Sequence, residues 1–133
     1  MIMIDSLRDI RVLIVEDEAM VAMLIEDILD EMGCKVAGIA SELGEALTKS
    51  EEEEFDIAIL DVNLNGARSF RVAEKLAELR VPFVFSTGYG FAGVPAAFHG
   101  VPVLVKPFRE HDLMDALATA LQSAAAPVGT IET

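Results

Sequence analysis

Short apolar runs alternate with amphipathic segments about five times along this chain of 133 residues. The first run, residues 10–15, precedes a segment over residues 19–32 whose apolar residues recur every three or four positions before Gly33. This spacing predicts an amphipathic helix, and the short apolar run before it predicts a strand that is covered on both faces. The same pattern predicts further strands at 35–40, 55–60, 81–86 and 101–105, and further helices at 41–54, 69–80 and 110–124. Ser41 is the expected N-cap of the second helix.

Right-handed connections between such units produce one doubly wound α/β domain, a (βα)5 fold with a five-stranded parallel sheet between helices. We expect the fourth helix to be short or irregular, because residues 88–100 contain four glycines and Pro95. Residues 10–124 are the predicted domain, residues 1–9 an N-terminal extension, and residues 125–133 a flexible tail. No second domain is expected in this sequence.

The charge balance narrows the classes of partner. Ten Lys and Arg against 23 Asp and Glu give a net charge of −13, which repels nucleic acids and anionic membranes. The single cysteine, Cys34, cannot form an internal disulfide, and the acidic N-terminus does not match a signal peptide. We therefore expect a cytoplasmic protein that binds neither nucleic acid nor membrane.

Chemically active side chains follow the ends of several predicted strands. Glu16 and Asp17 follow the first strand, Asp61 the third, Thr87 the fourth and Lys106 the fifth. Carboxylates about 5 Å apart repel by about 3 kcal/mol at an effective dielectric near 20, so a bound Mg²⁺ is expected. Magnesium leaves room for phosphate oxygens, which Lys106 and Thr87 would stabilise. Asp61 is then the candidate nucleophile.

Four segments together resemble the receiver domain of bacterial two-component response regulators, whose fold is CheY-like and flavodoxin-like. They are VLIVEDE (12–18), ILDVNLNG (59–66), FSTGYG (85–90) and VKPF (105–108), within a likeness that extends from Arg11 to Leu121. The resemblance implies that Glu16, Asp17, Asp61 and the backbone carbonyl of Asn63 hold Mg²⁺.

The resemblance also implies that Asp61 accepts a phosphoryl group from a histidine kinase phosphohistidine. Thr87 would bind a phosphoryl oxygen and Lys106 would pair with the phosphate, and a cis peptide bond is expected between Lys106 and Pro107.

The sequence departs from the usual receiver pattern at two positions. Val103 replaces the usual aromatic switch residue, and FSTGYG is similar to single-domain receivers that pair with kinases of the HWE or HisKA2 type. We hypothesise that Tyr89 has the switching role instead. Asn65 stands where proline is common, and we expect that difference to have little effect.

Surface residues near the predicted strand ends are candidates for partner docking. The core face of the first helix is filled by its other apolar residues, which are Val21, Leu24, Ile25, Ile28, Leu29 and Met32. Met20 and Met23 should therefore be exposed, and with Pro107 and Phe108 they are the predicted docking residues. Two scattered exposed methionines are an almost equally good interpretation.

The sequence thus predicts a stand-alone, monomeric receiver with Mg²⁺ as cofactor, a signalling protein rather than a metabolic enzyme. Its expected partner is a sensor histidine kinase or a histidine phosphotransferase, although a fragment of a longer regulator would have the same sequence. One alternative is a Mg²⁺-dependent phosphatase with an aspartyl nucleophile, but such sites have a second Asp where this chain has Asn63. A second alternative is a pseudo-receiver that only binds protein. A third is a flavodoxin-like FMN binder, which the acidic residues after the first strand disfavour because they would repel its phosphate.

Overall fold

A five-stranded parallel sheet forms the centre of the molecule. The computed structural model describes residues 7–88 and 93–125, so Tyr89 and most of the predicted tail lie outside the described residues. The strands are β1 (Arg11–Val15), β2 (Lys35–Ala40), β3 (Ile57–Asp61), β6 (Phe83–Thr87) and β7 (Val103–Val105). Their order across the sheet is β2-β1-β3-β6-β7, and every neighbouring pair is parallel. The predicted α/β fold is confirmed.

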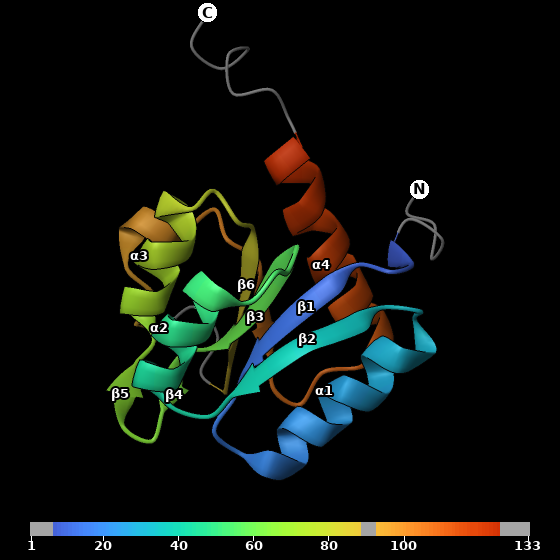
Figure 1. Ribbon diagram of the computed structural model, residues 1–133, viewed down its shortest axis with the longest axis horizontal. Helices are drawn as coiled ribbons and strands as arrows, with labels where there is room; N and C mark the ends of the chain where they lie inside the picture. The colour runs from blue at the N-terminus through green and yellow to red at the C-terminus, as the bar shows by residue number, and fades with distance from the viewer. Residues whose placement is uncertain (1–6, 89–92, 126–133) are drawn as a thin grey trace, which may run out of the picture.

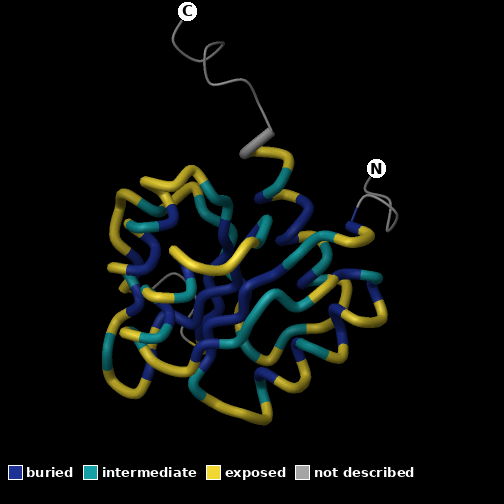
Figure 2. Tube along the Cα trace, viewed as in Figure 1, coloured by how far each residue is buried: buried dark blue, intermediate teal, exposed yellow. Residues whose placement is uncertain are grey.

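Helices cover both faces of the sheet (Figure 1). On one face, α1 (Ala19–Glu31) and α4 (Glu110–Ala125) pack on a core that includes Val12, Ile14 and Val84. On the other face, α2 (Leu43–Glu52) and α3 (Phe70–Glu78) pack on a core that includes Leu13 and Leu60. Figure 2 shows the central strands buried between these layers. No helix among the described residues is long and apolar enough to span a membrane.

In the described part of the fourth helical position, residue 88 and residues 93–100, the structure has one short 3₁₀ helix, Ala96–Phe98, and a short or irregular helix is what the sequence predicted. The Phe98 ring anchors this segment: its centroid lies 5.8 Å from that of Phe85 and 6.2 Å from that of Phe70. Aromatic packing therefore holds a segment whose backbone forms little regular structure.

A small β-hairpin lies between β3 and α3, where the sequence predicted a loop. Its strands are β4 (Asn63–Leu64) and β5 (Ala67–Arg68), and they pair antiparallel. The two turn residues, Asn65 and Gly66, have φ of 51° and 90°. An Asn-Gly pair is the strongest local signal for this tight turn, because both residues tolerate positive φ.

Two local predictions are wrong. Leu24 was assigned to the core, but 51% of its surface is exposed, because Ala22, Ile25, Ile28 and Leu29 form a narrower buried stripe. Ser41 is not the N-cap of α2, which begins at Leu43 after Glu42. The Ser41 N–H instead donates to Glu45 Oε1 at 2.9 Å.

Part of the predicted N-terminal extension packs on the domain. Leu7 is fully buried in the core of the α1 and α4 face. Its carbonyl accepts a hydrogen bond from Cys34 Sγ at 3.2 Å, and the Asp9 N–H donates to the Gly33 carbonyl at 2.8 Å. These contacts join the start of the described chain to the turn between α1 and β2.

Candidate functional site

The strand ends bring most of the predicted site residues into one open cleft of about 900 Å³. Parallel strands end at one edge of the sheet, so residues far apart in the chain meet there. The cleft is lined by Asp17, Glu18, Asp61, Val62, Asn63, Gly66, Arg68, Thr87, Gly88, Gly93 and Lys106. Glu16 is almost fully buried directly beside these residues, and its carboxylate contacts Lys106.

The ammonium of Lys106 joins carboxylates from two strands. Its Nζ lies 2.9 Å from Asp61 Oδ2 and 3.0 Å from Glu16 Oε1, with Glu18 Oε1 farther away at 3.9 Å. Partial burial disfavours the charged ammonium, but hydrogen bonding and attraction to Asp61 and Glu16 outweigh it and raise the pKa of Lys106. Lys106 is therefore a fixed positive charge beside the candidate nucleophile.

Asp61 is held at both carboxylate oxygens. Oδ2 accepts from Lys106, and Oδ1 accepts from the Asn63 N–H at 3.1 Å. Asp61 ends β3 and is itself buried, with a side chain 8% exposed. Its orientation is thus set by groups from two separate segments before any ligand arrives.

Glu16 lies in an electrostatically unfavourable environment. Its Oε2 accepts from the Glu18 N–H at 3.1 Å, whereas Oε1 is buried and lacks a well-directed hydrogen bond from any described residue, despite its ion pair with Lys106. Burial, with Asp61 nearby, raises the pKa of Glu16 to about 7. A cation on this carboxylate would relieve that penalty.

Asp17 is positioned by the β4–β5 hairpin. The Asn65 N–H donates to Asp17 Oδ2 at 2.9 Å. Partial burial opposes the charge of Asp17, but this hydrogen bond leads the contributions that lower its pKa. A proline at position 65 would lack this donor.

The acidic residues fit a hard divalent cation. One oxygen each from Glu16, Asp17 and Glu18 lie within 4.8 Å of one another, and the poorly satisfied Glu16 Oε1 belongs to this group of carboxylates. Oxygen ligands of this kind suit Mg²⁺. The resemblance implied Asp61 and the Asn63 carbonyl, rather than Glu18, as the ligands beside Glu16 and Asp17.

The other predicted residues lie around this centre. Thr87 is buried at the end of β6, and its carbonyl accepts from the Lys106 N–H at 2.8 Å. The Lys106–Pro107 peptide bond is cis, as the resemblance implied. The Asn63 side chain accepts from the Gly66 N–H at 3.0 Å, so it also stabilises the hairpin turn.

The sequence model of the response regulator receiver domain matches residues 12–118. The chain belongs to this family. Receiver domains are signalling phosphoacceptors of two-component systems, and they bind Mg²⁺ in an acidic pocket.

Solved structures and curated relatives support the same family. The solution structure of SdrG from Sphingomonas melonis Fr1 is 42% identical, covers 85% of this chain and 97% of SdrG, and superimposes with a TM-score of 0.77. SdrG has also been solved in a BeF₃-activated conformation, at 43% identity and a TM-score of 0.73. The chemotaxis protein CheY of Thermotoga maritima is 30% identical over 80% of this chain and 93% of its own length.

Other relatives are longer. The transcriptional regulatory protein PdtaR of Mycobacterium tuberculosis is 31% identical over 84% of this chain but only 56% of its own length. This chain thus spans about half the length of the first curated relatives that it matches.

Glu16→Gln should stabilise the metal-free protein at alkaline pH. Because the folded-state pKa of Glu16 is raised from 4.5 to about 7, ionisation costs stability progressively as pH rises through that interval. Urea denaturation in EDTA should show the variant more stable than wild type by about 1–3 kcal/mol at pH 8, with no difference near pH 4.5. Exposed Glu31→Gln is the matched control, and identical pH dependence of wild type and Glu16→Gln would contradict the assignment.

Asn65→Pro should raise the pKa of Asp17. The substitution removes the N–H that Asp17 accepts, and proline cannot adopt the positive φ of this position. Asn65→Gly keeps both features and should leave the pKa unchanged. Carboxyl ¹³C NMR titration measures this, and equal Asp17 pKa values in the two variants would show that the hydrogen bond is not responsible.

Proposed function

We propose that this protein is a single-domain response regulator that accepts a phosphoryl group from a phosphohistidine onto Asp61. The observation that carries the proposal is the position of Lys106, whose ammonium contacts the Asp61 carboxylate at the open end of the sheet. Family membership supports the same reading. The donor would be a sensor histidine kinase or a histidine phosphotransferase, in the cytoplasm.

Different residues would orient the nucleophile and stabilise the transferred phosphoryl group. Hydrogen bonds from Asn63 and Lys106 orient the Asp61 carboxylate for in-line attack on phosphorus. As the new oxygen–phosphorus bond forms, the bond from phosphorus to the donor imidazole nitrogen breaks. Lys106 stabilises the charge on the phosphoryl oxygens, and the Thr87 hydroxyl donates to one of them.

Glu16 and Asp17 would hold Mg²⁺, together with Asp61 and the backbone carbonyl of Asn63. When bound, the ion supplies positive charge that offsets repulsion between the carboxylates and the phosphoryl oxygens. The poorly satisfied oxygen of Glu16 supports this assignment. The phosphatase alternative has no specific support, since Asn63 occupies the position of the second acid and its amide is engaged in the hairpin turn.

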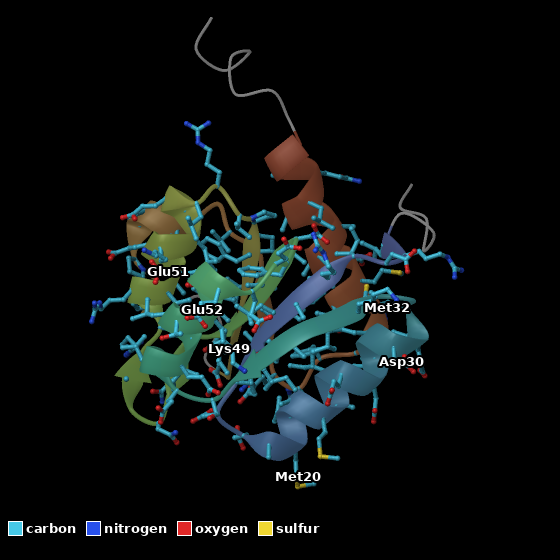
Figure 3. The ribbon with its side chains drawn as sticks, viewed as in Figure 1. Met20, Asp30, Met32, Lys49, Glu51 and Glu52 are labelled. Atoms are coloured by element: carbon cyan, nitrogen blue, oxygen red, sulfur yellow. The ribbon has the colours of Figure 1, made fainter. Side chains whose placement is uncertain are left out.

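We further propose that the partner docks on the α1 apolar patch, defined as Met20, Met23 and Leu24. These side chains are 83%, 61% and 51% exposed, and Figure 3 shows Met20 pointing away from the body of the molecule. Exposed Pro107 and half-buried Phe108, after β7, would extend the surface. Neighbouring exposed apolar residues of this size favour contact with the helices of another protein. A kinase of the HWE or HisKA2 type and a monomeric receiver are parts of the same proposal.

Asp61→Asn should abolish phosphorylation. With acetyl phosphate and Mg²⁺, intact-mass spectrometry should show an added phosphoryl group on wild type and none on the variant, because the amide is a poor nucleophile. Beryllofluoride should shift the NMR amide signals of the strand ends in wild type alone. Phosphorylation that persists in Asp61→Asn would refute the assignment of the phosphoacceptor.

The double variant Met20→Lys, Met23→Lys should slow phosphotransfer by about tenfold, because a docking surface is lost. The donor is the histidine kinase that phosphorylates the wild-type protein fastest. Phosphorylation by acetyl phosphate should proceed at the wild-type rate. Rapid-quench measurement of both donors tests this. Leu79→Lys is the matched control, since Leu79 is an exposed apolar residue at the C-cap of α3. Equal slowing with both donors would contradict docking at the α1 apolar patch.

A further inference from the structure

Arg68 is a charged residue of the cleft that the proposed chemistry does not use. It ends β5 and lines the same cleft as Asp61, Thr87 and Lys106. Within the part of the chain that the structure describes, its guanidinium has no ion pair or hydrogen bond, although Asp17, Glu18 and Asp61 line the same cleft. Lys106, by contrast, already contacts Asp61 and Glu16.

The guanidinium of Arg68 rests on Gly93, across the cleft from the hairpin. A Cβ atom at position 93 would lie 3.0 Å from Arg68 Nη1 and 3.8 Å from Cζ, which is too close for an ordinary contact with Nη1. The φ of Gly93 is also +84°. Glycine therefore allows both this backbone conformation and the close approach of the guanidinium.

A phosphoryl group on Asp61 would change the charge of the cleft. It carries close to two negative charges in place of the single charge of the free carboxylate, and three acceptor oxygens, beside carboxylates that Lys106 already neutralises only in part. A guanidinium has a planar fork of N–H donors that matches phosphate oxygens. Among the described residues Arg68 has no ion pair or hydrogen bond to break, only its packing against Gly93.

We propose that Arg68 binds the phosphoryl group carried by Asp61 and leaves Gly93 when it does so. This inference rests on the proposed function of Asp61. The contact that is lost lies two residues before Pro95, which caps the 3₁₀ helix of Phe98. Because Phe98 packs on Phe70 and Phe85, departure of the guanidinium frees one side of a segment that is otherwise anchored in the core.

Beryllofluoride with Mg²⁺ tests the proposal as a phosphoryl analogue, by NMR titration of the full chain. Arg68→Ala should weaken the apparent binding of beryllofluoride about tenfold, as expected for loss of a charge-assisted contact. The affinity of Arg68→Lys should lie between those of Arg68→Ala and wild type. The matched control is Arg71→Ala, which removes the same charge from an exposed position on α3 outside the cleft and should stay within about twofold of wild type.

The Gly93 amide signal supplies a second readout. It should shift with beryllofluoride in wild type and Arg71→Ala, and much less in Arg68→Ala. Wild-type affinity in Arg68→Ala, or equal losses of affinity in Arg68→Ala and Arg71→Ala, would overturn the role of Arg68 but leave the proposed function of Asp61 in place. Absence of beryllofluoride binding to wild type would overturn the proposed function as well.

Discussion

The ammonium of Lys106 holds the functional end of the molecule together. It joins Asp61 at the end of β3 to Glu16 at the end of β1, and both carboxylates are largely buried. Lys106 follows β7, which is separated from β3 by β6, so its side chain must reach over the end of β6. With this strand order, Nζ lies within 3.0 Å of one oxygen of each carboxylate. The site is thus a property of the topology rather than of any one loop.

One ammonium does not balance the carboxylates that surround it. Asp61 is oriented by two donors, whereas one oxygen of Glu16 is poorly satisfied and the pKa of Glu16 is raised to about 7. The unmodified cleft therefore has more negative charge than its fixed cations neutralise. Such a site favours a further cation first, and an anion only after that cation is in place. This order reconciles an acidic protein with phosphate chemistry.

Hydrophobic periodicity predicted the sheet, the helices and the residues at the strand ends, because those features depend on patterns that repeat over many residues. Features set by single hydrogen bonds were harder to predict from the sequence. The Asn65–Gly66 turn carried a recognisable signal, but its donation to Asp17 depends on how the hairpin folds back toward β1. Arg68 had no motif to mark it, since it lies beside Gly93, which is far from it in the sequence. Leu24 was misplaced because periodicity alone does not tell how wide the buried stripe is.

The overall charge adds a reason for selectivity toward a protein donor. A net charge of −13 disfavours the approach of small anionic donors, and the cations of the cleft act only at short range. Docking at the proposed α1 apolar patch would add binding energy that does not depend on charge. Beyond it α1 carries Glu26, Asp27, Asp30 and Glu31 and no basic residue. A complementary partner would therefore present apolar side chains to Met20 and Met23 and basic side chains to the second half of the helix. Such a surface speeds encounter through its charges and fixes the docked register through its apolar contacts.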